Sequence, residues 1–349
     1  MEQELNQSIT PKFTTATHRF IFRGANKAFK MNQPLIIIPI YNENDLLPIL
    51  LKKIDASLSS GSIEAGILFV DDGSSQEFSH ESLPQAGFQS IKSLSMLRLG
   101  RNLGHQRALA VGLAAAVKNK LSEILIVMDG DGEDDPVYLP DLVNRFRADS
   151  SRTTIFAKRK KRSEGLAFKI FYFFFQLSHR ILTGHSIYMG NFSIMSSANA
   201  RKLTLMSELW NHFSGAYIKS RIPWVCIDTI RARRIAGRSK MNFTSLVMHG
   251  VNAISVHADT MGVRTIIATV LMMTAGLIGI VSLLLIRIFT DLAIPGWTST
   301  LIFSILIIIL QTLIGALTLT FIVSAGRTSV VMTPASHFEQ FVLEIRKIF

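Results

Sequence analysis

Hydrophobic runs along the chain come in two lengths, and each length predicts a different kind of element. In the first two-thirds, short apolar runs end in polar or turn residues, as strands buried on both faces of a parallel sheet do. Segments with helical spacing lie between them. The expected strands are Leu35–Pro39, Ile67–Asp71, Met96–Leu99, Ile124–Asp129 and Thr153–Ala157, and the expected helices are Asn44–Ser57 and Gly104–Lys118. This alternation predicts a doubly wound, mainly parallel α/β domain over residues 33–235.

Two much longer apolar runs near the C-terminus predict membrane-spanning helices. Thr265–Ile286 contains no charged residue or histidine, and a second uncharged run extends from Leu292 to Gly326. Each can cross a hydrocarbon core of about 30 Å as a helix, whereas a buried core helix usually keeps one polar face. The short linker contains Pro295 and Gly296, so the two spans form an antiparallel hairpin. The expected regions are an N-terminal extension (1–32), the α/β domain (33–235), a juxtamembrane interfacial region (236–262), two transmembrane helices (263–326) and a C-terminal tail (327–349).

Composition and charge agree with a membrane protein and indicate its orientation. The chain is 48% hydrophobic, with a mean hydropathy of +0.32 and a formal net charge of +12. Basic residues flank the hairpin on one side, which the positive-inside rule makes cytoplasmic. They are Arg231, Arg233, Arg234, Arg238 and Lys240 before it, and Arg327, Arg346 and Lys347 after it. The first 34 residues contain no signal-peptide core, so we expect both termini in the cytoplasm. The single cysteine, Cys226, excludes a disulfide framework and a cysteine-based zinc site.

Two clusters of carboxylates follow predicted strands, where ligands of doubly wound sheets bind. Asp71 and Asp72 end one strand, and Asp129-Gly130-Asp131 with Glu133 ends another. Carboxylate oxygens at this spacing suit Mg²⁺ or Mn²⁺. An EF-hand fails, because its required Gly and Glu positions hold Asp134 and Pro140. A solvated acidic loop is the alternative interpretation. No dinucleotide-binding glycine motif, Walker A motif or hydrolase elbow occurs in the sequence.

The order of the motifs makes the prediction specific. Pro39-Ile40-Tyr41-Asn42-Glu43, Val70-Asp71-Asp72-Gly73-Ser74 and Asp129-Gly130-Asp131 together resemble the family 2 glycosyltransferases, which have the GT-A fold. Arg101-Asn102-Leu103-Gly104-His105-Gln106, the stretch from Asp129 to Pro136 and the C-terminal hairpin narrow the resemblance to polyprenyl-phosphate glycosyltransferases. This group includes dolichyl-phosphate mannose synthase and bacterial undecaprenyl-phosphate glucosyltransferases. The resemblance covers about residues 34–326.

The resemblance implies a role for each matching residue. Asp129, Asp131 and Glu133 would hold Mg²⁺ or Mn²⁺, and Arg159 and Arg162 would bind the lipid phosphate. Asp72 would face the base or ribose, while Asp71 has capping as its alternative role. The implied nucleotide-sugar residues are Pro39, Tyr41, Glu43, Asp71, Asp72, Asn102, Gly104, Asp129, Ser239 and Lys240. The implied catalytic group is Asp131, Asn191, Arg159 and Arg162.

Three positions depart from the family pattern. Glu133 stands where the family usually has Gln, which makes the expected metal site more negative, and Asp135 replaces a usual Pro. Asn191 stands where related enzymes commonly have an Asp that is a candidate catalytic carboxylate. An amide cannot accept a proton at neutral pH, so a general-base role is excluded here. A phosphate acceptor needs no base, whereas a sugar hydroxyl would.

Basic and aromatic segments outside these motifs indicate contact with a membrane. The run Lys158–Arg162 suits phosphate capture and anionic headgroups, and no aromatic stacking pattern of a nucleic-acid-binding module accompanies it. Aromatic residues are concentrated in Leu166–Leu182, and apolar residues recur at helical spacing from Phe243 to Ile254. Both segments are expected to be membrane-surface helices, with ordinary core helices as the alternative.

The resulting expectation is an inverting glycosyltransferase of the cell (inner or plasma) membrane. It would transfer one sugar from a UDP- or GDP-sugar to polyprenyl phosphate at the cytoplasmic face. A homo-oligomer is left open. The alternatives are a processive polysaccharide synthase, disfavoured because no QxxRW motif occurs, and a membrane-anchored binding protein with a degenerate site.

Overall fold

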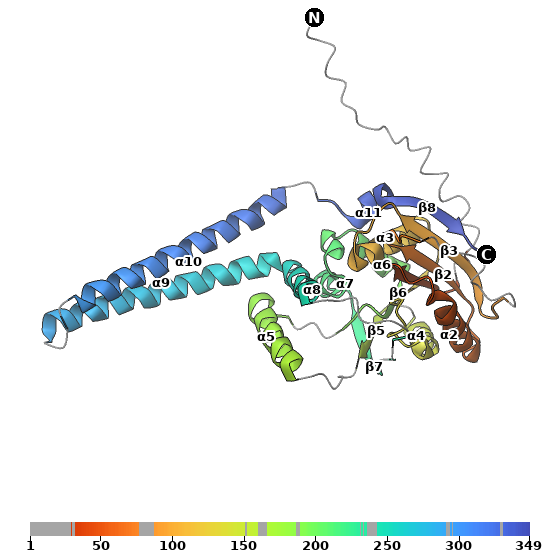
Figure 1. Cartoon of the computed structure of the whole chain (residues 1–349), viewed down its shortest axis with the longest axis horizontal. Coiled ribbons are helices and arrows are strands. Elements are labelled where there is room, and N and C mark those ends of the chain that lie inside the picture. Colours follow the sequence, from red (N-terminus) through yellow and green to blue (C-terminus); the bar gives the residue numbers. More distant parts are fainter. Residues whose placement is uncertain are drawn as a thin grey trace, which may run out of the picture. The chain divides into compact units, whose positions relative to one another are not determined.

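The computed structural model describes residues 29, 32–76, 87–150, 152–159, 166–185, 189–230, 232, 234–235, 243–290, 294, 296–328 and 331–349. The chain divides into two compact units (Figure 1). The first unit, which we call the catalytic unit, is drawn from residues 1–162, 188–242 and 332–349, and the second from residues 163–187 and 243–331. The first contains the predicted α/β domain, and the second contains the predicted membrane hairpin.

The catalytic unit is built on one mixed sheet with the strand order β7-β5-β6-β4-β1-β2-β3-β8. Strands β1, β2, β3 and β4 are parallel to one another, while β6 and β8 run antiparallel to their neighbours. The predicted α/β architecture is confirmed, and the two antiparallel strands are additions to it. The strands are β1 (Leu35–Ile40), β2 (Ala65–Asp71), β3 (Ile91–Leu99), β4 (Ile124–Val127), β5 (Thr154–Arg159), β6 (Ser193–Ser196), β7 (Trp224–Thr229) and β8 (Val342–Lys347).

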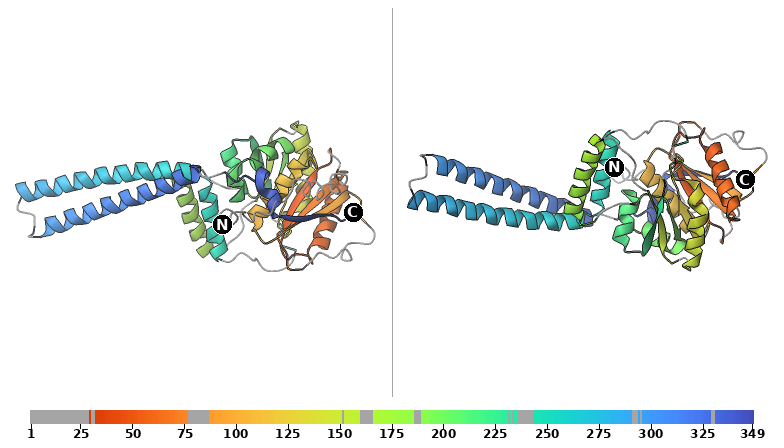
Figure 2. Two further views of the ribbon diagram at one scale, coloured as in Figure 1. Left: turned by 90° about the horizontal axis from the view of Figure 1, so that it is seen from above. Right: turned by 90° about the horizontal axis from the view of Figure 1, so that it is seen from below.

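Helices cover both faces of this sheet (Figures 1 and 2). One hydrophobic core includes residues of α3 (His105–Lys118), α6 (Ser197–Thr204) and α7 (Phe213–Ser220). The other includes residues of α2 (Leu47–Ser60) and α4 (Leu139–Ala148). Every residue of β1 is buried, which explains its unbroken apolar sequence. Short helical turns complete the unit: η3 (Pro136–Tyr138), η4 (Ser207–Trp210), α11 (Pro334–His337) and η5 (Phe338–Phe341).

The C-terminal segment, expected as a tail, is part of the catalytic unit. Strand β8 pairs with β3 over five residue positions, and Phe338 is fully buried in the same core as α3. The side chains of Val342 and Ile345 pack against that core, while Leu343, between them, is 60% exposed. β8 is short and carries charged residues, as an edge strand can, so its sequence does not indicate that it belongs to the sheet.

The described part of the second unit contains four helices. They are α5 (Leu166–Thr183), α8 (Phe243–Ser255), α9 (Ala258–Phe289) and α10 (Trp297–Thr328). Helices α9 and α10 pack against each other, and at Gly276 an added Cβ would lie 2.8 Å from Cδ1 of Ile309. Both are long and apolar enough to cross a membrane, and only 6% of their most apolar windows is buried. That exposure is inconsistent with core helices of a soluble protein.

Helices α5 and α8 form where surface helices were expected. Apolar side chains that the structure places on them are exposed: Phe173, Leu177 and Ile181 on α5, and Val247, Met248 and Val251 on α8. Arg264 of α9 caps the end of α5, its Nη1 donating to the carbonyl of Ile181 at 2.6 Å and of Arg180 at 3.2 Å. A cation at a helix C-terminus compensates the unpaired carbonyls there.

Candidate active site

The predicted site residues that the structure describes lie in loops after β1, β2 and β4 and at the ends of adjoining elements. These three strands are neighbours and parallel, so their carboxyl ends meet at one edge of the sheet. The loops touch there: a Cβ added to Gly130 would lie 3.2 Å from Oε2 of Glu43 and 3.0 Å from the carbonyl oxygen of Pro39. Pro39 itself is buried within β1, and Tyr41 is 39% exposed.

The two aspartates after β2 both bind backbone amides. Asp72 accepts from the amides of Leu103 at 2.7 Å and Gly104 at 2.9 Å, and so holds the segment that begins α3. Burial raises the pKa of the Asp72 carboxyl. Asp71 accepts from the amide of Ser74 at 2.9 Å, which is the capping role considered as its alternative. Gly73, at φ +71°, is required here because an added Cβ would lie 2.7 Å from the backbone of Arg101.

These contacts leave Asn102 and Gly104 beside the end of β2, as expected from the motif order. Asn102 is exposed, and Gly104 is the N-cap of α3 with φ +91°. The anchoring contact from Asp72 to the amides of Leu103 and Gly104 was not predicted, because the sequence gives no sign that these two segments touch.

A tight loop after β4 carries the predicted metal ligands. We call residues 129–135 the acidic loop. The buried Asp134 closes it by accepting from the amide of Asp129 at 2.9 Å, and Asp131 accepts from the amide of Glu133 at 2.9 Å. Asp135 caps η3 by accepting from the amide of Val137 at 3.1 Å. The loop therefore presents Asp129, Asp131 and Glu133 while Asp134 and Asp135 support its shape.

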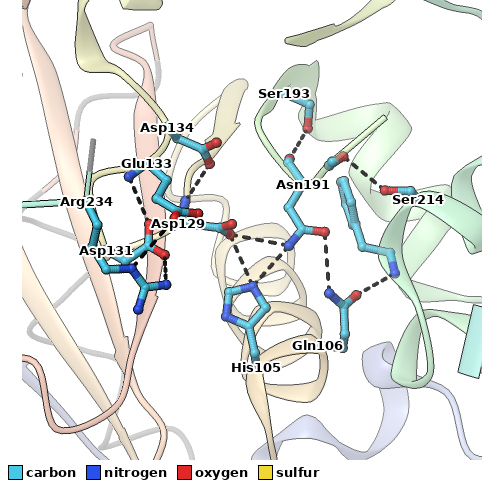
Figure 3. A network of polar contacts seen from close by, with 12 residues as sticks. His105, Gln106, Asp129, Asp131, Glu133, Asp134, Asn191, Ser193, Ser214 and Arg234 are labelled. Atoms are coloured by element: carbon cyan, nitrogen blue, oxygen red, sulfur yellow. Dashed lines mark hydrogen bonds and ion pairs between the residues drawn. The ribbon is translucent and has the colours of Figure 1, made fainter. Parts of the chain in front are cut away.

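Asp129 lies at one end of a series of hydrogen-bonded polar side chains that includes Asn191 (Figure 3). Its Oδ1 lies 3.1 Å from His105 Nε2 and accepts from Asn191 Nδ2 at 3.3 Å. Asn191 Oδ1 accepts from Gln106 Nε2 at 3.4 Å, and Gln106 Oε1 accepts from the amide of Phe213 at 2.7 Å. A backbone N–H can only donate, so this last contact fixes which end of the Gln106 amide faces Asn191. Asn191 is thereby oriented with its NH₂ toward Asp129.

His105, from the Arg101–Gln106 motif, lies against the acidic loop. Burial alone would lower the pKa of its imidazole, but the carboxylates of Asp129, Asp131 and Asp134 outweigh burial and hold that pKa above its usual value. Its Nε2 also lies 3.0 Å from Asn191 Nδ2. His105 thus lies between Asp129 and Asn191, where the neighbouring carboxylates favour its protonated form.

Asp131 and Glu133 face a different cation, Arg234. Arg234 Nη2 lies 2.6 Å from Asp131 Oδ2, and its Nε lies 3.7 Å from Glu133 Oε1 (Figure 3). The sequence indicated Arg234 only as one of the basic residues before the first span. Its contact with a loop a hundred residues earlier depends on the pairing of β7 with β5, which no local pattern reveals.

The predicted metal ligands have the oxygen donors that a hard divalent cation prefers. Their side chains do not converge on a single position. Within the described ranges, no group of three or more His, Cys, Asp or Glu side chains is arranged to hold a metal ion. Asp129 turns toward His105 and Asn191, whereas Asp131 turns toward Arg234. All three are carboxylates on one short loop; Asp129 and Asp131 are partly exposed, and Glu133 is buried. Oxygen donors of this kind suit Mg²⁺ or Mn²⁺.

Four predicted residues cannot be placed in the site. Arg159 ends β5, but its side chain lies outside the described residues, as do Arg162, Ser239 and Lys240 entirely. Their roles in binding the lipid phosphate and in closing the donor site stay predictions.

Comparison with known proteins agrees with this arrangement. Residues 35–204 match the family described as glycosyl transferase family 2. The chain is 28% identical over 231 residues to a prophage bactoprenol glucosyl transferase homolog of Escherichia coli, which covers 63% of this chain and 71% of that protein. It is 29% identical over 224 residues to an undecaprenyl-phosphate 4-deoxy-4-formamido-L-arabinose transferase of Photorhabdus laumondii, covering 61% of this chain and 64% of that one.

Among solved structures, glucosyl-3-phosphoglycerate synthase from Mycobacterium tuberculosis aligns with 72% of this chain and 86% of its own, at 14% identity and a TM-score of 0.45. The family match spans β1 to α6 and includes Asp72, the acidic loop and Asn191. The chain therefore carries a glycosyl transferase family 2 domain and is a glycosyltransferase.

Proposed function

We propose that the protein transfers a single sugar from a UDP- or GDP-sugar to polyprenyl phosphate, with inversion, in a reaction that depends on Mg²⁺ or Mn²⁺. The observation that carries this proposal is the acidic loop at the carboxyl edge of the sheet in a chain that also has two exposed apolar helices. A lipid acceptor requires an enzyme held at a membrane. The names of the two relatives, a bactoprenol glucosyl transferase homolog and an undecaprenyl-phosphate 4-deoxy-4-formamido-L-arabinose transferase, support the same acceptor class.

The proposed reaction does not need a general base to activate the acceptor. A phosphate monoester has a second pKa near 6, so the acceptor is mostly dianionic at pH 7 and is already a nucleophile. One of its oxygens forms a bond to the anomeric carbon from the face opposite the diphosphate. The bond between that carbon and the diphosphate oxygen breaks, and the nucleoside diphosphate leaves with the electron pair. An amide at Asn191 is compatible with this reaction, since no proton has to be removed.

The residues of the site would position the two substrates. Tyr41, Glu43, Asn102 and Gly104 would line the nucleotide pocket, with the loops around them held by Asp71 and Asp72. A bound Mg²⁺ or Mn²⁺, held by Asp129, Asp131 and Glu133, would neutralise the diphosphate leaving group. Asn191 would orient donor or acceptor through hydrogen bonds. Arg159 and Arg162 would hold the lipid phosphate in line for attack, with Ser239 and Lys240 closing the donor site.

We further propose that the catalytic unit and both termini are cytoplasmic in the cell membrane, with the linker between α9 and α10 on the other side. The basic residues on both flanks of the hairpin support this orientation. Exposed apolar side chains on α5 and α8 suit helices lying in the membrane surface.

One experiment tests the reaction and its metal dependence. The full chain in membranes containing undecaprenyl phosphate is incubated with radiolabelled UDP-glucose, UDP-galactose, UDP-N-acetylglucosamine or GDP-mannose, and lipid products are extracted. We expect one donor to label the lipid, and Asp131→Asn to reduce labelling at least a hundredfold by removing an anionic ligand.

The matched control is Asp141→Asn, which changes an exposed carboxylate of α4 that pairs with Arg145. It should transfer sugar like the unaltered protein. Full activity of Asp131→Asn, or in excess chelator, would refute the metal role. If the unaltered protein is inert with every donor, the degenerate binding protein becomes the better interpretation.

A further inference from the structure

The segment after β7 lies along the acidic loop and is bonded to it through both backbone and side chain. The amide of Ala232 donates to the carbonyl of Glu133 at 3.2 Å, and the amide of Ile235 donates to that of Asp131 at 3.2 Å. Arg234, between them, places its guanidinium on the two carboxylates (Figure 3). Gly132, at φ +78°, makes room for this segment, because an added Cβ would lie 2.5 Å from Ile235.

Burial makes this ion pair more than a surface contact. The side chains of Arg234, Asp131 and Glu133 are only 22%, 16% and 9% exposed. A charge pair at 2.6 Å in such a setting is screened little by solvent or salt. The two carboxylates would repel each other without a cation between them, so the guanidinium stabilises the acidic loop as it stands.

Both oxygens of Asp131 are already engaged. Oδ1 accepts from the amide of Glu133 at 2.9 Å, and Oδ2 holds Arg234 at 2.6 Å. A divalent metal ion approaches a carboxylate oxygen to about 2.0–2.2 Å, and a guanidinium cannot occupy the same side of that oxygen. A metal ion that bound Asp131 Oδ2 and Glu133 Oε1 on the side that Arg234 occupies would therefore displace the guanidinium.

We propose that Arg234 is the resident counter-cation of the acidic loop and competes with the divalent metal ion for Asp131 and Glu133. This inference rests on the metal site of the proposed function. Free metal then binds weakly, because it must displace a positive charge that the loop already holds. A nucleotide diphosphate relieves the competition, since it offers the displaced guanidinium another anion to which it can bind.

Glu133 strengthens this competition in the present chain. A carboxylate at this position attracts both the metal ion and the guanidinium, whereas a glutamine amide would hold neither by charge. One divalent ion neutralises the charges of Asp131 and Glu133. The guanidinium of Arg234 is then left without an anion to pair with. The diphosphate is the anion that the reaction itself brings.

The test is the affinity of the full chain in detergent for Mn²⁺, measured from the electron paramagnetic resonance signal of free Mn²⁺. Without nucleotide, Arg234→Ala should bind Mn²⁺ at least about fivefold more tightly than the unaltered protein, a typical coupling between competing ligands. The gain in Mn²⁺ affinity on adding UDP or GDP should also be smaller in Arg234→Ala. A purely structural Arg234 predicts the opposite sign, because loss of loop order would weaken metal binding.

Two further variants complete the experiment. Arg145→Ala removes a guanidinium that pairs with Asp141 on the exposed surface of α4 and should leave Mn²⁺ affinity unchanged. Arg234→Lys keeps the charge but lacks the planar guanidinium fork and its five donors, so its Mn²⁺ affinity should fall between those of the unaltered protein and Arg234→Ala. If Arg234→Ala does not fold, the Mn²⁺ affinity of Arg234→Lys provides the test.

The outcomes separate this inference from the proposed function. Unchanged or weaker Mn²⁺ binding in both Arg234 variants would overturn the competition. Tighter binding in the variants, in a protein that transfers no sugar to polyprenyl phosphate, would support the competition and reject the acceptor. No Mn²⁺ binding by any of the proteins, with or without nucleotide, would reject the metal site and the inference together.

Discussion

Asn191 is held in one orientation by a chain of contacts that starts at a backbone amide. The N–H of Phe213 fixes Gln106, and Gln106 fixes the oxygen of Asn191. The NH₂ of Asn191 is then left to donate to Asp129 at 3.3 Å. An aspartate in this place would bring a second carboxylate against Asp129. The amide therefore suits a site in which Asp129 is needed in its charged form.

We expect Asn191→Ala to slow sugar transfer less than Asp131→Asn does. The alanine removes a hydrogen bond from an uncharged amide to the Asp129 carboxylate, worth about 10- to 100-fold in rate, whereas the asparagine removes an anionic ligand. The comparison uses initial rates of labelled lipid formation at saturating donor. A loss equal to that of Asp131→Asn would mean that Asn191 has a direct chemical role. An inert unaltered protein that becomes active as Asn191→Asp would identify a degenerate site.

At the residue scale, the sequence predicted where a motif lies in the fold when that motif directly follows a strand. The acidic loop and the β1 and β2 loops lie where their sequence order placed them, because parallel neighbouring strands bring their carboxyl ends together. Arg234 and Gln106 were missed as site residues. Each reaches its partner across a long sequence separation, so its role depends on tertiary packing that no window of sequence contains.

At the scale of elements, long apolar runs were easier to interpret than short mixed ones. β1, β2, α3 and the two long helices follow from unbroken or periodic hydrophobicity. β6 has only four residues, and β8 mixes apolar with charged residues. Neither strand therefore stands out in the sequence. Both are antiparallel additions to the parallel sheet. The parallel strand β7 and the short helices α4, α6 and α7 were not predicted either.

The segment that precedes β8 should be essential for the stability of the catalytic unit. Phe338 is fully buried, so Phe338→Ala should lower the free energy of unfolding by about 3–5 kcal/mol. The control is Leu343→Ala in the adjoining strand β8, where the side chain is 60% exposed and the expected change is within about 0.5 kcal/mol. Thermal unfolding of the detergent-solubilised protein, followed by tryptophan fluorescence, measures both. Equal midpoints for the two variants would contradict the packing of this segment into the core.

At the scale of the whole molecule, the hairpin helices are longer than a membrane requires. At 1.5 Å per residue, each of the 32-residue helices extends about 48 Å, against a hydrocarbon core of about 30 Å. In α9, Arg264 and Arg287 bracket the uncharged part, which has a length close to that of the core. The Arg264 end is also the end that caps α5, so we expect α5 to lie level with the membrane surface on that side.

Labelling of single cysteines tests the proposed orientation. In a Cys226→Ser background, we expect Thr290→Cys to react with a membrane-impermeant maleimide added to sealed cells. Lys347→Cys should react only after permeabilisation, because β8 belongs to the unit that we place in the cytoplasm. Labelling of Lys347→Cys from outside would reverse the orientation. Equal labelling of both positions in sealed cells would show leaky cells rather than topology, and a cytoplasmic marker enzyme controls for that.

The position of β8 at the end of the chain ties the assembly of the sheet to protein synthesis. A ribosome makes β1 to β7 first, then both apolar helices, and only afterwards the strand that pairs with β3. Until then β3 presents unpaired backbone groups along the sheet edge, a surface open to mispairing with other chains. A nascent chain that stalls while its hairpin enters the bilayer is therefore left with an unfinished catalytic sheet. The catalytic sheet is thus completed only after both apolar helices have been synthesised.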